Sequence, residues 1–242
     1  MQNTHTTASA EYVINLVWNF MNHVRGNFSI GEMFNSTLAI LYAFHKGYPI
    51  RVIDNRRIEF EPNDDKLFCD LINLIPNDKH LHNAMSQCPQ ELILMDKEEF
   101  NSVYEEVLRG LFDLVSCSLG REYGEFYTPS AITKLQAYIV NKEGCNEVFD
   151  PFCGTASIIH EMSKFGGVSH YSGQDVNYKT SIYARLNAEA HYGHDECIKN
   201  FDSISHWDET HFDAVVSCPP FAVRLTPEQL SLARHITPQW PC

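Results

Sequence analysis

Hydrophobic residues recur at helical spacing through the first half of the chain. Apolar positions three and four residues apart form one face of an amphipathic helix, and such a face is usually core. The segment from Asp96 to Glu99 (Asp-Lys-Glu-Glu) is a capping-box signature that opens the longest stripe. The predicted helical stripes are Val13, Val17, Phe20, Met21 and Val24; Phe34, Leu38, Leu41 and Tyr42; and Phe100, Val103, Tyr104, Val107, Leu108, Leu111 and Val115. A groove for a partner helix is the alternative interpretation.

The pattern changes near Leu119. Beyond it, short apolar runs alternate with helical stretches, which is typical of strands connected by crossover helices. We therefore predict a helical domain over residues 1–119, a hinge at 120–124, and an α/β domain over residues 120–242. The four predicted strands are 146–150, 171–175, 196–202 and 212–217. In the first domain, residues 48–61 are expected to form a hairpin that turns at Asp54-Asn55.

Acidic residues end three of the predicted strands. Asp150 precedes a turn of small residues, 151–157, which leads into an apolar helix. This strand, turn and helix form the first unit of a doubly wound nucleotide-binding fold, in which ligands bind at the carboxyl ends of the strands. Asp175 follows 25 positions later, where a carboxylate accepts from ribose hydroxyls, and Asp202 ends the third strand. Taken singly, each acid could be a solvated loop residue or a helix cap.

The fourth predicted strand runs into Cys-Pro-Pro-Phe, residues 218–221. Two prolines end a strand and stiffen the backbone beyond it. An Asn or Asp followed by Pro-Pro and an aromatic residue offers acceptors to a ring amino group and a flat surface to the base. Alone, this tetrapeptide is more often an ordinary turn.

With these motifs assembled, the chain resembles the modification (M) subunit of type I restriction-modification enzymes. That family contains adenine-N6 DNA methyltransferases that use S-adenosylmethionine. The likeness covers most of the chain and is strongest from Arg121 to Phe221. It rests on Gly-Glu-Phe-Tyr-Thr-Pro at 124–129, Asp-Pro-Phe-Cys-Gly-Thr-Ala-Ser at 150–157, Gly-Gln-Asp at 173–175, Asp202, and Ser-Cys-Pro-Pro-Phe at 217–221.

The resemblance implies a helical N-terminal domain plus an incomplete Rossmann-like methyltransferase domain of the α/β class. It implies DNA as the substrate, with the adenine flipped out of the duplex, and a specificity subunit and a restriction subunit as partners. No metal is implied. The expected catalytic residues are Cys218, Pro219, Pro220 and Phe221; the Pro219 carbonyl would accept from the amino group and Phe221 would stack on the base. The expected residues of the S-adenosylmethionine site are Phe126, Tyr127, Thr128, Asp150, Gly154, Thr155, Asp175 and Asp202.

The chain departs from the family pattern in three ways. Ala156 and Ser157 stand where glycines are usual, so a methyl group is expected to crowd the cofactor. Cys218 replaces the catalytic Asn or Asp, and a thiol is a weak acceptor. Only four of the family's seven strands are identifiable, and the sequence ends 21 residues after Phe221, so we expect a truncated domain. The exposed edge of the strand at 212–217 would then need a cover, which could be the tail over 225–242, with a short helix predicted after Thr226, another chain, or a neighbouring molecule in a crystal.

Composition bears on partners and compartment. The chain has 18 Lys+Arg and 31 Asp+Glu, a net charge of −13, which is the wrong sign for holding DNA mainly through its phosphates. A partner could supply the basic surface. Eight cysteines without a Cys-x-x-Cys pair favour a reducing compartment. The polar start of the chain lacks a signal peptide, and no run reaches membrane-spanning length, so a soluble cytoplasmic protein is expected.

Three alternative functions stay open. The first is a catalytically inactive cofactor-binding or assembly subunit, which Cys218 favours. The second is a methyltransferase acting on protein glutamine or RNA, although those enzymes usually carry Asn-Pro-Pro-Tyr. The third is a cytosine-C5 enzyme with a nucleophilic cysteine, in which that cysteine follows the proline rather than preceding it. His191, His194 and Cys197 could suggest a metal, but a polar helix end is the simpler interpretation.

Overall fold

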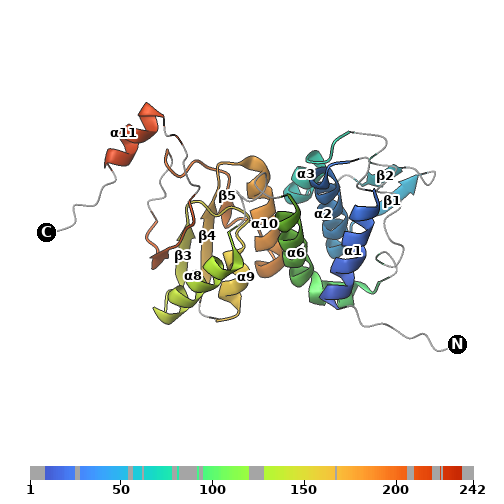
Figure 1. Cartoon of the computed structure of the whole chain (residues 1–242), viewed down its shortest axis with the longest axis horizontal. Coiled ribbons are helices and arrows are strands. Elements are labelled where there is room, and N and C mark those ends of the chain that lie inside the picture. Colours follow the sequence, from blue (N-terminus) through green and yellow to red (C-terminus); the bar gives the residue numbers. More distant parts are fainter. Residues whose placement is uncertain are drawn as a thin grey trace. The chain divides into compact units, whose positions relative to one another are not determined.

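The protein is described by a computed structural model whose contacts divide the chain into two units, Met1–Gly124 and Glu125–Cys242 (Figure 1). The structure describes residues 9–24, 28–53, 57–61, 63–77, 81, 92, 95–119, 128–166, 168–205, 210–219, 224 and 226–235. The boundary at residue 119 and the hinge at 120–124 stay predictions, since residues 120–127 lie outside this description.

Helix α2 (Ile30–Lys46) is the centre of the first unit. It packs against α1 (Ala10–Val24), α3 (Lys66–Asn73) and α6 (Lys97–Leu119). Nearly all of the predicted stripe residues whose side chains are described are buried or half-buried. The expectation of a single apolar face was too narrow for α2, because its polar residues Asn35, Ser36 and Thr37 are buried too. Asn35 donates its side-chain amide to the Leu74 carbonyl at 3.1 Å, which satisfies a group that would otherwise be costly to bury.

Local sequence signals fix the ends of these helices. Ser29 and Glu32 form a reciprocal capping box at the start of α2, and Gly47 ends it with φ 77°, a conformation that glycine adopts without strain. At the start of α6, the Asp96 carboxylate accepts from the Glu98 and Glu99 N–H groups at 2.9 and 3.0 Å. The helix start predicted at Asp96 is therefore confirmed.

The hairpin predicted at 48–61 is also present. Strands β1 (Ile50–Ile53) and β2 (Arg57–Phe60) pair antiparallel, with Ile50 opposite Phe60. Their turn, which we placed at Asp54-Asn55, lies outside the described residues.

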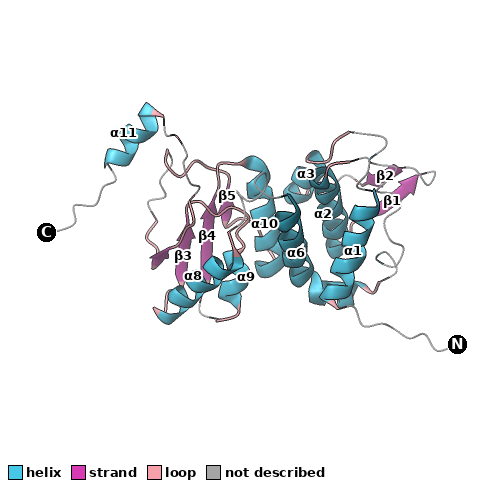
Figure 2. Ribbon diagram, in the orientation of Figure 1, coloured by secondary structure: helices cyan, strands magenta, loops and turns pink. Residues whose placement is uncertain are grey.

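The second unit is built on a parallel sheet (Figure 2). The strand order is β5-β4-β3-β6, and all three pairings are parallel. The elements in chain order are α8 (Ser130–Lys142), β3 (Glu147–Asp150), α9 (Ile158–Ser163), β4 (His170–Gln174), α10 (Tyr178–Tyr192), β5 (Ile198–Lys199), β6 (Ala214–Val215) and α11 (Pro227–His235). This alternation of helices and parallel strands is the α/β arrangement that the sequence predicted.

The strand order reverses between β3 and β6. The chain moves outward from β3 through β4 to β5 and then returns to the other side of β3. In open parallel sheets such a switch point leaves a crevice at the carboxyl ends of the strands, where ligands bind. The turn after Asp150 and the loop that starts at Ser217 both leave the sheet at this point.

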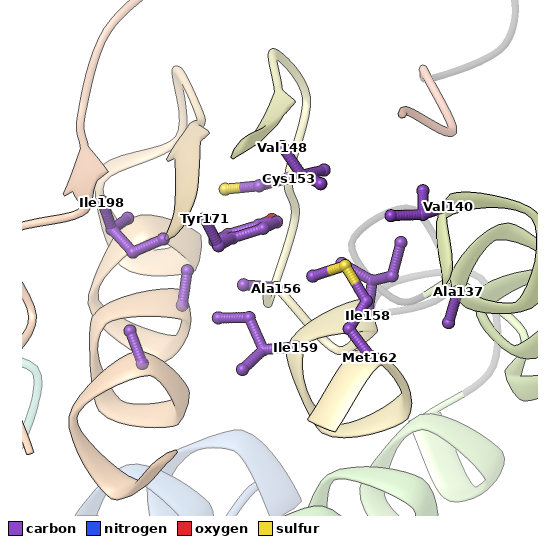
Figure 3. Packing of buried hydrophobic residues seen from close by; sticks show 12 residues of the cluster. Ala137, Val140, Val148, Cys153, Ala156, Ile158, Ile159, Met162, Tyr171 and Ile198 are labelled. Carbon is purple, nitrogen blue, oxygen red and sulfur yellow. The ribbon is translucent and has the colours of Figure 1, made fainter. Parts of the chain in front are cut away.

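One hydrophobic core joins the sheet to its helices. Val148 of β3, Tyr171 of β4 and Ile198 of β5 meet apolar side chains of α8, α9 and α10 (Figure 3). Phe149 points to the opposite face of the sheet and stacks on Phe212, with ring centroids 4.9 Å apart. The alternation along β3 is what separates the two faces.

Two predicted strands are shorter than expected. Strand β5 ends at Lys199, and the side chain of the next residue, Asn200, donates to the Asp175 and Val176 carbonyls. Strand β6 spans Ala214–Val215 and pairs, among the described residues, with β3 alone. The helix predicted after Thr226 is present as α11, and its Gln229 reaches Asp202. Whether the tail covers the edge of β6 stays a prediction. Within the described ranges, no helix has both the length and the apolar composition needed to cross a bilayer.

Gly173 lets β4 approach the turn that follows β3. A β-carbon at this position would lie 2.9 Å from Ile198 Cδ1 and 3.1 Å from both Cβ and Sγ of Cys153. Cys153 is buried, and its N–H donates to the Gln174 carbonyl at 2.9 Å, so it cannot move away easily. The absence of a side chain at Gly173 therefore sets how closely the turn packs on the sheet.

We expect Gly173→Ala to destabilise the chain by about 1–3 kcal/mol, the usual cost of overpacking a filled core. Urea unfolding would measure this change. The double variant Gly173→Ala/Ile198→Val removes the nearest methyl group and should recover part of the loss. A double variant no more stable than Gly173→Ala would contradict the steric explanation.

Candidate cofactor and catalytic site

Asp150 ends β3 at the switch point and is the most buried carboxylate of the candidate site. It is 6% exposed, and its Oδ1 accepts from the Phe152 N–H at 3.1 Å. Burial raises the pKa of Asp150 to about 7, an effect that the nearby Asp175 charge increases. The Ser217 hydroxyl, the Phe152 N–H and the Tyr171 hydroxyl partly oppose this rise in pKa. Neither hydroxyl has the geometry of a full hydrogen bond to a described partner.

The Asp175 carboxylate ties the turn after β3 to the end of β4. Its Oδ2 accepts from the Gly154 N–H at 3.1 Å, and its Oδ1 accepts from the Asn177 N–H at 2.8 Å. Burial raises the pKa of Asp175, while these two hydrogen bonds act to lower it. Each oxygen keeps a second lone pair, so the carboxylate can still accept from ligand hydroxyls.

Helix α10 also holds the turn after β3 through a hydrogen bond. The Asn187 side-chain amide on α10 donates to the Thr155 carbonyl at 2.7 Å. The Thr155 hydroxyl is buried and has no hydrogen-bond partner among the described residues. A buried polar atom without a partner is costly unless a ligand or water satisfies it. The turn therefore carries an acceptor or donor that a ligand could use.

Ala156, which stands where glycines are usual in the family that the motifs resemble, adopts φ 56°. A left-handed conformation costs an L-residue about 1–2 kcal/mol. However, Ala156 is 1% exposed and its methyl belongs to the hydrophobic core, where burying a methyl group is worth roughly 0.8 kcal/mol. The methyl packs into the core beneath the turn (Figure 3). The burial of this methyl group argues against crowding of the cofactor, and the expectation from the sequence stays a prediction.

Ser203 brings the segment after β5 to the same turn. Its buried hydroxyl lies 2.6 Å from the Pro151 carbonyl and 2.7 Å from the Gln174 Oε1. Asp202, the neighbouring residue, does not end the strand as predicted but begins a turn three residues beyond β5. The Ser203 contacts therefore link Asp202 to the end of β3.

Asp202 is ionised and largely satisfied by three donors. Its Oδ1 accepts from the Ile204 N–H at 3.0 Å, and its Oδ2 accepts from the Ser205 hydroxyl at 2.7 Å and the Gln229 Nε2 at 3.0 Å. The bond from Ser205 makes the largest contribution to lowering the pKa of Asp202. Helix α11 thus places an amide donor on this carboxylate.

Cys218 and Pro219 follow β6 on the other side of the switch point. The last sheet hydrogen bond of this strand runs from the Val216 N–H to the Phe149 carbonyl at 2.9 Å. The next residue, Ser217, has its hydroxyl beside Asp150 and its carbonyl bound by the Gln136 side-chain amide at 3.1 Å. Cys218 is half-buried and Pro219 is exposed.

The structure thus brings together most of the predicted site residues that it describes. Asp150, Gly154, Thr155 and Asp175 lie around one turn, and Asp202 joins them through Ser203. Thr128 is half-buried two residues before α8. The remaining predicted site residues, Phe126, Tyr127, Pro220 and Phe221, lie outside the described part of the chain.

Sequence reasoning missed several residues that support the site. Asn177 caps α10, a position that its place between Asp175 and an apolar helix could have indicated. Gln136, Ser203 and Gln229 gave no such signal, because their partners lie 81, 29 to 52, and 27 residues away. Within the described ranges, no three His, Cys, Asp or Glu side chains are grouped to hold a metal ion.

Comparison with protein families gives one match that covers more than half of the chain. Residues 95–235 match the model of the N-6 DNA Methylase family. The methylase subunit of the type I restriction enzyme MpnII from Mycoplasma pneumoniae is 30% identical over 152 residues, which are 53% of this chain and 28% of that protein. The methylase subunit of MjaVIII from Methanocaldococcus jannaschii is 26% identical over 180 residues, 70% of this chain and 31% of that protein. These alignments span about three-tenths of each relative.

Solved structures support the same fold. The methyltransferase subunit of a type I restriction-modification system from Streptococcus thermophilus aligns with a TM-score of 0.59 at 16% identity, over 90% of this chain and 65% of that one. A Listeria monocytogenes chain described as a class I S-adenosylmethionine-dependent methyltransferase aligns with a TM-score of 0.53 at 18% identity, over 93% of this chain and 62% of that one. At such identities the likeness shows the fold alone.

The raised pKa of Asp150 makes folding depend on pH. Its ordinary value is 3.8 and its value in the folded chain is about 7, so the folded chain keeps a proton that the unfolded chain releases in this window. The free energy of unfolding should therefore fall as pH rises from about 4 to about 7. We expect Asp150→Asn to flatten this part of the profile, measured by urea unfolding. Asp202→Asn is the control, since the lowered pKa of Asp202 places its titration at more acidic pH. An unchanged slope in Asp150→Asn would contradict the assignment.

Proposed function

The chain belongs to the N-6 DNA methylase family, and from this premise we propose that it is an S-adenosylmethionine-dependent adenine-N6 methyltransferase subunit of a type I restriction-modification system. The observation that carries the proposal is the meeting of two loops at the switch point. The turn after β3 and the loop after β6 leave two paired strands, in which the Val216 N–H donates to the Phe149 carbonyl at 2.9 Å, and Ser217 lies beside Asp150.

The described residues fit S-adenosylmethionine. The Thr155 hydroxyl, which has no partner among the described residues, offers a polar group in a turn that Gly154 ties to Asp175, and Asp175 can still accept from ribose hydroxyls. Asp202 would accept from the adenine amino group. The acidic side chains at this sheet edge, when ionised, also favour a cationic ligand. When bound, the cofactor supplies a methyl group already activated on a sulfonium.

The loop after β6 would receive the target base. In our proposal Pro219 offers its backbone carbonyl to the adenine amino group, Pro220 stiffens the loop and Phe221 stacks on the ring. Cys218 occupies the position of the second acceptor, where a thiol is weaker than an amide oxygen. The chain's own contribution to rate is then mainly orientation of the base toward the methyl group.

Partners would complete the system. The relatives in Mycoplasma pneumoniae and Methanocaldococcus jannaschii are methylase subunits of type I restriction enzymes. We propose that a specificity subunit reads the DNA sequence and that a restriction subunit joins the complex. With a net charge of −13, this chain depends on such partners for a surface that attracts phosphates.

We expect Asp175→Ala to weaken S-adenosylmethionine binding roughly 5- to 150-fold, which corresponds to the loss of about 1–3 kcal/mol of hydrogen bonding. Isothermal titration calorimetry would measure the affinity. Asp213→Ala is the matched control, because Asp213 also accepts from two backbone N–H groups, those of Asn146 and Glu147, but at the opposite end of β3. Equal affinity in the wild type and Asp175→Ala would contradict this cofactor site.

We expect Cys218→Asn to raise methyl transfer on the order of 10²-fold, since it restores one acceptor at the reacting centre. Transfer of a labelled methyl group to adenine in DNA would be measured for the chain alone and mixed with the other subunits of the complex. Cys69→Asn, at an exposed cysteine of the other unit, is the control. If cofactor binds but neither residue at 218 gives product, a cofactor-binding assembly subunit is the better description.

A further inference from the structure

The loop that carries Cys218 begins after the last hydrogen bond between the described residues of β6 and β3. The Val216 N–H makes the last ladder bond, to the Phe149 carbonyl at 2.9 Å. Pro219 and Pro220 have no N–H groups, so they cannot anchor the loop by donating backbone hydrogen bonds. The two prolines therefore leave a larger share of the support of the loop to groups elsewhere in the fold.

Helix α8 provides that support through Gln136. The Gln136 Nε2 donates to the Ser217 carbonyl at 3.1 Å, across 81 residues of sequence. The carbonyl belongs to the peptide that joins Ser217 to Cys218. Fixing its direction restricts the plane of that peptide, and with it the positions of the Cys218 N and Cα atoms from which the loop continues.

The donor is itself held in place. Gln136 is half-buried on α8 beside Thr133, Ala137 and Val140, which are buried against the sheet. Ala137 and Val140 belong to the same core as Val148 of β3, the strand that pairs with β6. The Gln136 amide is therefore carried by α8, a helix that packs on the same sheet from which the Cys218 loop departs.

We propose that Gln136 is a positioning residue for the Cys218 loop. Its hydrogen bond fixes the backbone at Ser217, one residue beyond the last hydrogen bond between β6 and β3. Gln136 thereby sets the geometry of the loop without touching the reacting atoms. The inference deepens the proposed function and, in its catalytic part, rests on it. The anchoring contact itself can be tested without any activity.

The test uses two variants of the 242-residue chain. Gln136→Met keeps the size of the side chain and removes the donor, and Gln136→Glu places a carboxylate oxygen against the Ser217 carbonyl. Leu135→Met is the control on the same helix, at a side chain that is 59% exposed. The readout is the rate at which iodoacetamide alkylates Cys218, followed by peptide mass spectrometry, with the half-buried Cys197 measured in the same samples.

We expect Cys218 to react about 2- to 10-fold faster in both variants, the change in loop population that the loss of one hydrogen bond allows. Cys197 and the control should keep their rates. Equal Cys218 rates in all chains would overturn the proposal. So would a parallel rise at Cys197, because it would show general loosening rather than loss of one anchor.

A second measurement separates this inference from the proposed function. In a Cys218→Asn background, Gln136→Met should lower the rate of methyl transfer about 2- to 10-fold and leave the dissociation constant of S-adenosylmethionine unchanged. If the wild type binds no cofactor while Cys218 still reacts faster in the Gln136 variants, the proposed function fails and the anchor stands. If methyl transfer occurs but neither rate responds to Gln136, the anchor fails and the function stands.

Discussion

Two backbone N–H groups, from Gly154 and Asn177, donate to the two oxygens of Asp175, and the second unit is organised around this carboxylate. One donor belongs to the turn after β3 and the other to the start of α10. The backbone of Asp175 is bound too, since its N–H donates to the Lys199 carbonyl and its carbonyl accepts from Asn200. A single residue thereby fixes a turn, a helix start and the end of β5 relative to one another.

The electrostatic character of the site follows from where its acids lie. Asp150 is buried beside Asp175, and burial raises the pKa of both, whereas Asp202 is half-buried among donors that lower its pKa. The site therefore combines a carboxyl group that titrates near neutral pH with a carboxylate that stays charged. Because these pKa values differ, one ligand in the crevice can contact both a protonated carboxyl group and an ionised carboxylate.

Sequence reasoning anticipated the parts of this fold that depend on local pattern. The parallel strands at 147–150 and 170–174, the hairpin after Tyr48 and the capped start of α6 each have a periodicity or a cap that can be read directly. Reasoning from the sequence failed for features that depend on contacts between residues far apart in the chain. The burial of Asn35 depends on a carbonyl 39 residues away, and Asn200, which follows the short β5, has its hydrogen-bond partners 24 and 25 residues away. Gln136, Ser203 and Gln229 are ordinary polar residues in the sequence, and only the folded chain brings them to their partners.

The side-chain amide of Gln229 makes hydrogen bonds at both of its ends, and these bonds couple ligand binding at Asp202 to the formation of α11. Its Oε1 accepts from the Thr226 N–H at 3.0 Å, the Thr226 hydroxyl accepts from the Gln229 N–H at 3.2 Å, and its Nε2 donates to Asp202. The two ends of one planar amide cannot be redirected separately. Turning the amide to free Asp202 also breaks one of the two cap bonds at the start of α11, so a ligand that takes the place of Gln229 on Asp202 weakens the start of that helix. By thermodynamic linkage, the factor by which the formed cap weakens such a ligand is the same factor by which the bound ligand disfavours the cap.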